Sequence, residues 1–184
     1  MKENVRVKAD AMKKLNDISM KGEIVVFGST YMSEFPLYEL VNRCTFEHAI
    51  YNRSIAGLTV NEALEIVDDC VISINPCKIF LSLGEEDENN PDAINRYARL
   101  VSAIRSKLPD CSLYLIGLTG CGKFVEEFNN NIKYLCDNKK VKYIDFISKQ
   151  ASEAALYKAR FKQLSCFFRN KPVTSSEAFA ISSI

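Results

Sequence analysis

The sequence is poor in histidine, because His48 is the only one among its 184 residues. Structural zinc sites are built from clustered Cys and His side chains, so this composition argues against one. Seven cysteines are present, but they are scattered and no two form a C-x-x-C pair. An odd, unpatterned set of this kind is typical of reduced thiols, most of them buried. We expect no metal site and no cofactor, and a Cys–His nucleophile pair stays open.

The chain also lacks an excess of charge and any long apolar run. It carries 24 basic and 23 acidic residues, a net charge of +1, so no feature favours nucleic acid or an anionic membrane as a partner. Its apolar runs are a few residues long, whereas a membrane span needs about 20. The first residues, MKENVRVKADAMKK, do not contain the apolar core of a signal peptide. We therefore expect a cytoplasmic protein.

What is present is the composition of an ordinary soluble globule, with 47% hydrophobic and 26% charged residues. A length of 184 residues suits one domain with a full core. We expect a single domain over residues 1–170 and a C-terminal tail over 171–184, rich in serine.

The segment IVVFGSTYMSEFP, residues 24–36, is the one around which the chain is organised. Its first four residues are β-branched or aromatic, a pattern typical of a short strand buried on both faces. The small residues Gly28, Ser29 and Thr30 follow at the expected turn. Ligands in open α/β sheets bind at the carboxyl ends of strands, so this turn is a candidate site. Alternatively, the two hydroxyls only cap the turn.

Strands and helices alternate along the rest of the chain. The pattern predicts strands at residues 24–27, 49–51, 79–83, 113–116 and 141–146. It predicts helices at residues 7–18, 38–43, from 59 onward, 90–107, 124–136 and 151–168. This alternation favours parallel βαβ units in a three-layer α/β/α sandwich with a parallel five-stranded sheet.

Four of these helices carry specific signals. The helix at 7–18 has apolar residues at Ala11, Met12, Leu15 and Ile18, which we expect to face the core. Thr59 and Glu62 have the spacing of a capping box. Asn90 and Pro91 fit an N-cap and a first helical residue. The last helix contains Phe161, Leu164, Phe167 and Phe168, which suggest core or a dimer contact.

Unusual residues follow three of the expected strands. They are Gly28-Ser29-Thr30, the segment 54–57, and Gly84-Glu85-Glu86-Asp87. The carboxyl ends of parallel strands meet at one edge of the sheet, which we call the carboxyl rim. We expect Thr30, Gly57 and Glu86 to meet there.

Four segments together resemble the SGNH hydrolases, also known as the GDSL-like lipase/acylhydrolase superfamily. They are VVFGST, YNRSIAGLTVNEAL, IFLSLGEED and EFNNNIKYLCDNKKVKYIDF, and the resemblance spans roughly residues 22–150. It implies a flavodoxin-like fold and hydrolysis of acyl esters by an activated serine. It also implies a small acyl or carbohydrate ester as the ligand, and a homo-oligomer is compatible with it.

Carried over residue by residue, the resemblance is partial. Gly28 and Gly57 match glycines of the family pattern, and Gly84 and Asp87 fit its third block. Ser29 stands at the position of the family aspartate. These five residues are assigned to the site by the resemblance.

The positions that carry the chemistry depart from the pattern. Thr30 replaces the nucleophilic serine, and Glu86 replaces the asparagine that donates to the oxyanion. No Asp-x-x-His follows the fifth strand, and His48 precedes the second. A carboxylate that only accepts would repel an oxyanion. The departures predict an impaired esterase or a non-catalytic ligand-binding protein, with a carboxylate acting as base to Thr30 as the alternative.

One competing motif points to a different function. Residues Gly117–Lys123 match G-x-x-x-x-G-K between a strand and a helix, the context of a phosphate-binding loop. Phe124, however, stands where a hydroxyl would hold magnesium. The alternatives are a nucleotide-binding loop and a plain glycine-rich turn. The acidic run Glu85–Glu88 is likewise compatible with a hard cation or with a solvated loop.

Overall fold

The computed structural model describes residues 1–42 and 44–169. Five parallel strands form one sheet in the order β2-β1-β3-β4-β5. This is the flavodoxin-like order, in which the chain reverses direction across the sheet at β1. The predicted parallel five-stranded sheet is therefore confirmed. The strands are β1 (Ile24–Gly28), β2 (Ile50–Asn52), β3 (Lys78–Ser82), β4 (Ser112–Ile116) and β5 (Val141–Ile144).

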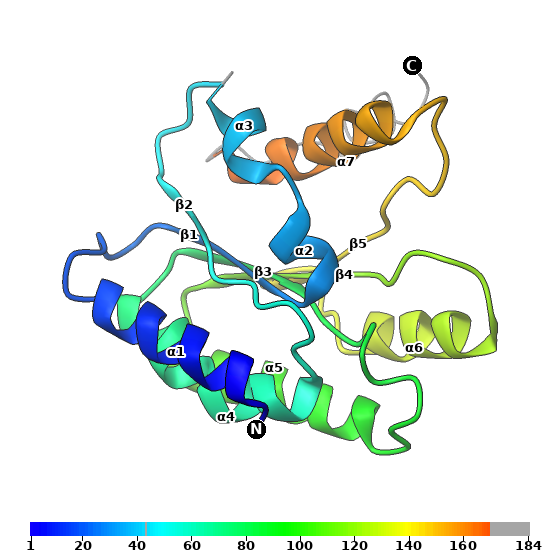
Figure 1. Cartoon of the computed structure of the whole chain (residues 1–184), viewed down its shortest axis with the longest axis horizontal. Helices are drawn as coiled ribbons and strands as arrows, with labels where there is room; N and C mark the ends of the chain where they lie inside the picture. The colour runs from blue at the N-terminus through cyan, green and yellow to red at the C-terminus, as the bar shows by residue number, and fades with distance from the viewer. Residues whose placement is uncertain (43, 170–184) are drawn as a thin grey trace.

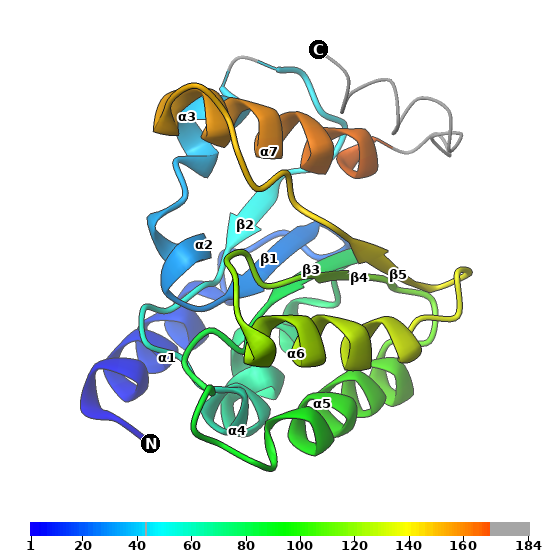
Figure 2. The ribbon, with the colours of Figure 1, turned by 90° about the vertical axis from the view of Figure 1, so that its right-hand side faces the viewer.

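Helices cover both faces of the sheet, which confirms the predicted three-layer sandwich (Figure 1). Turning the molecule shows the same division, with two groups of helices on opposite sides of the strands (Figure 2). One face carries α1 (Glu3–Leu15), α4 (Val60–Cys70), α5 (Ala93–Lys107) and α6 (Lys123–Tyr134). The other carries α2 (Thr30–Glu34), α3 (Leu37–Val41) and α7 (Glu153–Phe168). A single turn of 3₁₀ helix, Ile72–Ile74, follows α4.

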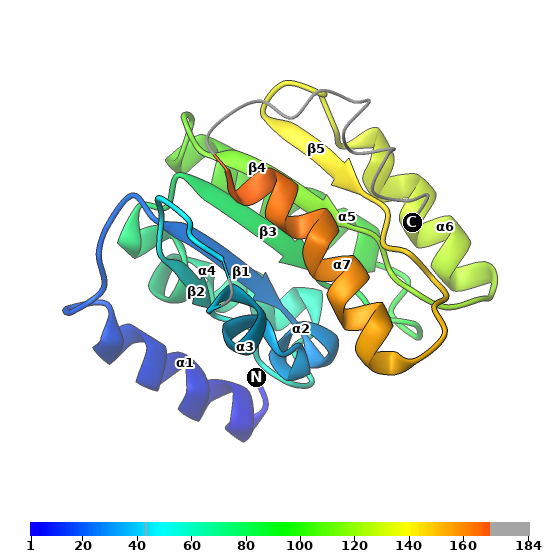
Figure 3. The same cartoon turned by 90° about the horizontal axis from the view of Figure 1, so that it is seen from above.

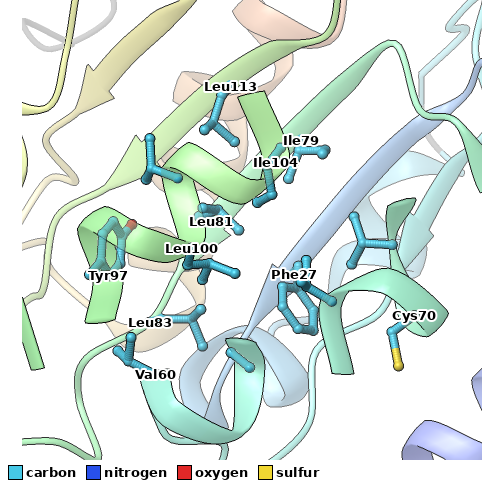
Figure 4. Packing of buried hydrophobic residues seen from close by; sticks show 14 of the residues in the cluster. Phe27, Val60, Cys70, Ile79, Leu81, Leu83, Tyr97, Leu100, Ile104 and Leu113 are labelled. Atoms are coloured by element: carbon cyan, nitrogen blue, oxygen red, sulfur yellow. The ribbon is translucent and has the colours of Figure 1, made fainter. Parts of the chain in front are cut away.

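The core on the α4–α5 face is mostly aliphatic. Alternate residues of β1 point to opposite faces, so Val25 and Phe27 pack here while Ile24 and Val26 pack on the other side. Figure 4 shows Leu81 of β3 next to Leu100 of α5, and Leu83 between Leu100 and Val60 of α4. Both faces of β1 are buried, as its unbroken apolar run predicted.

The core on the α7 face is aromatic. The rings of Phe80 and Tyr114 stack with centroids 4.6 Å apart, and Phe168 meets Phe80 edge-on at 5.1 Å. Seen from above, α7 crosses over β3 and β4 (Figure 3). Phe161 and Leu164 are also buried against this layer, so the prediction of a core role for these residues is confirmed.

The prediction for the first helix was wrong in position, and of its expected apolar stripe only Met12 packs against the core. The helix spans Glu3–Leu15 rather than 7–18, and its buried residues are Val5 and Ala9. Leu15 and Ile18 are 49% and 80% exposed. The helix packs on α4, and Lys13 and Asn16 at its carboxyl end bond to Asp69 of α4, which leaves Leu15 and Ile18 on the solvent side.

The start of α5 also differs from the prediction. The helix begins at Ala93, and the N-cap position is Asp92 rather than Asn90. Asn90 Oδ1 instead accepts from the Asp92 N–H, which makes a local turn that includes Pro91. The predicted capping box of Thr59 and Glu62 at α4 is confirmed.

Other boundaries shift by one or two residues. The strand predicted at 141–146 ends at Ile144, the helix predicted at 124–136 covers Lys123–Tyr134, and the helix predicted at 151–168 begins at Glu153 with Ser152 as its cap. The helix expected at 38–43 is Leu37–Val41. Residue 43 and the expected tail at 171–184 lie outside the described residues.

The cysteines are less buried than their composition suggested. All seven are free thiols, but only Cys70 and Cys111 are buried, and Cys44 and Cys121 are exposed. Burial raises the pKa of Cys70 to about 11 and of Cys111 to about 12. These two thiols are therefore protonated at neutral pH and act as small apolar side chains. None of the helices in residues 1–42 and 44–169 combines the length and apolar character that a membrane crossing demands.

The carboxyl end of α7 is held by a lysine from the sheet. Lys78 Nζ donates to the backbone carbonyls of Phe167 at 2.8 Å and of Arg169 at 2.7 Å. Carbonyls at the end of a helix have no partner within it and carry partial negative charge. The ammonium group thus satisfies the helix terminus and complements its dipole.

We expect Lys78→Met to lower the free energy of unfolding by about 1–2 kcal/mol, because charge-assisted hydrogen bonds to the helix end are lost while the apolar stem remains. Urea unfolding of wild type and variant would measure this. Lys158→Met, on the exposed side of α7, is the matched control and should unfold at the wild-type midpoint. Identical midpoints for both variants would contradict the role of Lys78.

A second polar anchor closes the turn between α6 and β5. Asp137 Oδ1 accepts from the backbone N–H groups of Lys139, Lys140 and Val141, each at 2.8 Å, and Oδ2 accepts from Arg105. These bonds, led by that from Val141, hold the pKa of the Asp137 carboxyl well below its usual value. Because the pKa is depressed on folding, the carboxylate stabilises the fold above the unfolded-state pKa of about 4.

Asp137→Asn should therefore cost about 1 kcal/mol at pH 7, a figure that allows for solvent screening of this half-exposed side chain. The difference between variant and wild type should shrink as the pH falls below about 4, where the Asp137 carboxyl of the unfolded chain becomes protonated while that of the folded protein stays ionised. Urea unfolding between pH 7 and pH 3 would measure it. A difference that stays constant over this range would refute the contribution of the charge.

Candidate functional site at the carboxyl rim

Thr30, Gly57 and Glu86 meet at the carboxyl rim. Thr30 Oγ1 donates to Glu86 Oε1 at 2.6 Å and accepts from the Gly57 N–H at 2.8 Å. The three residues follow β1, β2 and β3, as the parallel topology requires. The hydroxyl therefore sits between one acceptor and one donor, with both of its hydrogen-bonding roles in use.

The backbone ladders that place these residues continue beyond the strands. Ile55 N–H bonds to Gly28 C=O at 3.0 Å, and Ser29 N–H bonds to Ser82 C=O at 3.0 Å. Gly28 has no room for a side chain, because a Cβ there would lie 2.7 Å from the Ser82 carbonyl oxygen. Gly57 has φ +77°, a conformation that favours glycine and that turns its N–H toward Thr30.

A second carboxylate lies beside the first. Glu85 Oε1 accepts from the backbone N–H of Tyr31 at 2.9 Å. Burial raises the pKa of Glu85, with a further contribution from neighbouring Glu86, against the hydrogen bond from Tyr31 that lowers it. Ser29 is fully buried, and its side chain lies close enough to Glu85 to act against this rise in the Glu85 pKa. The alternative interpretation, that the Ser29 hydroxyl only caps the turn, is not supported, because the Ser29 side chain makes no capping hydrogen bond to α2.

Gly84 and Asp87 have structural roles in the loop after β3. Asp87 is buried, and its Oδ2 accepts from the Val60 N–H at 2.9 Å, which caps α4. Gly84 has φ +115°, and a Cβ there would lie 2.3 Å from the ring of Phe128. Both residues shape the loop after β3 without reaching Thr30 by a hydrogen bond.

His48 lies at the amino ends of the strands, on the side of the sheet opposite the carboxyl rim. It precedes β2, and its Nδ1 is 3.2 Å from Glu23 Oε2, just before β1. The segment after β5 is instead tied to α7, since Arg160 Nε donates to Ile147 C=O and Gln163 Nε2 donates to Asp145 C=O. No described residue near Thr30 is a histidine.

No protein-family model matches the sequence, and no curated protein matches it. A Streptococcus pneumoniae structure provisionally described as a platelet activating factor is 18% identical, covers 90% of this chain and 93% of its own, and has a TM-score of 0.77. A provisionally assigned acylhydrolase from Bacteroides fragilis is 12% identical. It covers 92% of this chain and 100% of its own, with a TM-score of 0.71. The chain has the fold of the SGNH hydrolases.

A third neighbour extends the range of activities on this fold. The family 3 carbohydrate esterase of Clostridium thermocellum is 15% identical over 89% of this chain and 100% of its own, with a TM-score of 0.63. At such identities the likeness shows the shared fold alone.

Two residues of the rim were not found from the sequence. Arg160 is 4% exposed and its Nη1 donates to Tyr31 Oη at 2.7 Å, with its guanidinium 5.0 Å from the centre of the Tyr31 ring. The signal was present, because Arg160 lies in the same helical stripe as the buried Phe161 and Leu164. The role of Tyr31 was not predicted, because this residue directly follows Thr30 and belongs to no periodic pattern.

The glycine-rich loop Gly117–Lys123 joins β4 to α6 at the same rim. Asn129 closes the loop by accepting from the Leu118 N–H at 2.7 Å and donating to the Leu118 C=O at 2.9 Å. Lys123 Nζ lies 3.5 Å from Glu127, and its side chain is 88% exposed. In residues 1–42 and 44–169 no group of three His, Cys, Asp or Glu side chains is placed to hold a metal ion.

We expect no magnesium-dependent binding of ATP or GTP at the millimolar level, because Phe124 offers no hydroxyl to the metal and Lys123 already has an acidic partner. Isothermal titration calorimetry with and without magnesium would test this. Saturable, magnesium-dependent binding that Lys123→Ala abolishes and Lys133→Ala preserves would establish a nucleotide site instead.

Proposed function

We propose that this SGNH-fold protein has lost the serine-esterase mechanism and uses its carboxyl rim to bind a small carbohydrate or acyl ester. The observation that supports this most directly is the position of the Thr30 hydroxyl between Glu86 and the Gly57 N–H. In a working site that N–H would be free to stabilise the developing oxyanion. Here it already donates to the nucleophile position.

The electrostatics of the rim disfavour an oxyanion. Glu86 replaces an amide donor, and Glu85 occupies the N–H of Tyr31. Loss of a single oxyanion donor costs about 100- to 1,000-fold in rate, and a carboxylate at that place adds repulsion. Negative charge that develops between these two side chains would be destabilised.

The base is missing as well. A serine or threonine hydroxyl needs a neighbouring group to remove its proton, and imidazole suits neutral pH best. His48 is at the other edge of the sheet. The segment that would carry an Asp-x-x-His in the resemblance is fixed to α7 by Arg160 and Gln163. Because no histidine among the described residues lies near Thr30, the rim suits ligand binding better than hydrolysis.

The same groups suit a ligand rich in hydroxyls. Glu85 and Glu86 present acceptors, so a ligand has to bring donors, as a sugar does. Tyr31 is only partly buried and adds an aromatic surface beside them. A carbohydrate esterase of Clostridium thermocellum that shares the fold was solved with cellohexaose, which agrees with a sugar-bearing ester here. Cytoplasmic location, self-association and a single domain over 1–170 remain predictions.

A second candidate is slow hydrolysis with Glu86 as the base. The 2.6 Å hydrogen bond from Thr30 Oγ1 to Glu86 has the direction that general-base catalysis requires. Glu86→Gln separates the two functions, since it keeps the size of the side chain and removes the base. Turnover of p-nitrophenyl acetate that falls to background in both Glu86→Gln and Thr30→Ala would favour the hydrolase.

The main proposal makes a prediction about repair. Thr30→Ser with Glu86→Asn restores the nucleophile and the amide donor of the family pattern, but it supplies no base. We expect at most feeble turnover of p-nitrophenyl acetate, on the order of the thousandfold over water that oxyanion donors and binding alone sustain. The variant should fold, because both side chains become smaller at a partly exposed position.

The control pairs Thr30→Ala with Glu86→Asn and so has no hydroxyl at the nucleophile position. Both double variants should show similar turnover. Rapid turnover that only the serine variant shows would reveal a base that serves residue 30, and the loss of serine-esterase chemistry would be disproved.

Calorimetry with an acetylated cello-oligosaccharide tests the binding role. Glu86→Ala should weaken the affinity for this ligand at least tenfold, and Glu126→Ala should not.

A further inference from the structure

A groove lies along the free edge of β2, away from Thr30. It has a volume of about 270 Å³ and is lined by the end of α1, the segment after it, α3 and β2. Its apolar lining is Met12, Leu15, Ile18, Tyr38 and Tyr51, and its polar residues include Arg53. Leu15, Ile18 and Tyr38 are all at least 49% exposed, so the groove is open to solvent.

The floor of this groove carries a buried positive charge. Arg53 is 4% exposed, and its guanidinium lies 5.6 Å from the centre of the Tyr51 ring. Its Nη1 donates to the Met12 carbonyl at 3.1 Å and its Nη2 to Ser19 Oγ at 2.8 Å. Across residues 1–42 and 44–169, no carboxylate forms an ion pair with it.

A buried cation without an anionic partner is unusual. Removal of a guanidinium from water is unfavourable, and an ion pair or a set of good acceptors normally offsets this cost. The Met12 carbonyl belongs to the last turn of α1, whose partial negative charge offsets only part of this cost. A guanidinium carries five N–H donors, and protein atoms accept from two of its nitrogens here.

The two tyrosines add further donors. Tyr51 Oη accepts from the Met20 N–H, and Tyr38 Oη accepts from the Asn52 N–H, each at 3.0 Å. A phenol that accepts through its oxygen keeps its own proton for a second partner. The groove thus combines a positive charge and hydroxyl donors with an apolar wall.

We propose that this groove binds a small carboxylate with a short apolar body, and that Arg53 neutralises the carboxylate. Charge complementarity selects the anionic end, because guanidinium and carboxylate form charge-assisted hydrogen bonds. The apolar wall takes the rest of the ligand. The volume lies at the small end of ligand pockets, which suits a body of a few carbons.

Sodium hexanoate is the probe, followed by titration calorimetry and by chemical-shift changes in the labelled protein. We expect saturable binding with a Kd on the order of 1 mM or below for a ligand of this size. Hexan-1-ol has the same body without the charge and should bind at least tenfold more weakly. Equal affinity for the two probes, or no saturation by hexanoate, would overturn the proposal.

Leu15 gives a variant that does not disturb the fold, because its side chain is half exposed at the mouth of the groove. Leu15→Asp places a carboxylate near Arg53 and should weaken hexanoate at least tenfold. Leu15→Asn is the matched polar control and should change affinity less than threefold. Thr30→Ala, at the carboxyl rim, should leave it unchanged. Equal effects of the aspartate and the asparagine would overturn the charge-based recognition.

Arg53→Lys should retain weaker binding, and Arg53→Met should lose it while its folding is checked by circular dichroism. Sedimentation velocity addresses another occupant of the groove, a second copy of the chain. A monomer whose state does not change with Leu15→Asp agrees with a small-molecule site. A dimer that Leu15→Asp dissociates, with no hexanoate binding, would identify the groove as a protein interface and refute the proposal.

Discussion

The arrangement of the carboxyl rim depends on the two hydrogen-bond ladders that join β1 to β2 on one side and to β3 on the other. Strand order reverses at β1, so the segments that follow these three strands end side by side although they lie far apart in the sequence. Gly28 lets the ladders continue, because its lack of a side chain leaves room for the Ser82 carbonyl. The contacts between Thr30, Gly57 and Glu86 follow from this close approach of backbones.

The segment after β2 separates two environments of opposite charge. On the side of the rim, Gly57 contacts Thr30 next to the two carboxylates. On the side of α1, Arg53 reaches under the helix end. Asn52 fixes the segment between them, because its Nδ2 donates to the Met32 carbonyl and its Oδ1 accepts from the Ser54 N–H. A change in this short segment would therefore alter both environments, and experiments on either one need controls for the other.

The order of strands and helices could be predicted because buried parallel strands are continuous apolar runs that stand out between helical patterns. The meeting of Thr30, Gly57 and Glu86 followed from topology alone. The direction of the hydrogen bonds did not, since residue types do not reveal that Gly57 donates to the hydroxyl itself. The buried face of α1 was not predicted correctly, because periodicity identifies an apolar stripe on a helix but not the surface against which the helix packs. Leu15 and Ile18 belong to that stripe, yet they line a groove instead of the core.

The two outer helices differ in how they are attached, and this has a consequence for the motions of the molecule. α7 is fastened at its carboxyl end by Lys78 and near its middle by Arg160 and Gln163, in addition to its aromatic core contacts. α1 buries only Val5 and Ala9. Opening of α7 therefore requires the loss of contacts at both edges of the sheet, whereas α1 can detach as a small cooperative unit. In amide hydrogen exchange, α7 should follow global unfolding, and α1 should exchange through a local event of lower free energy.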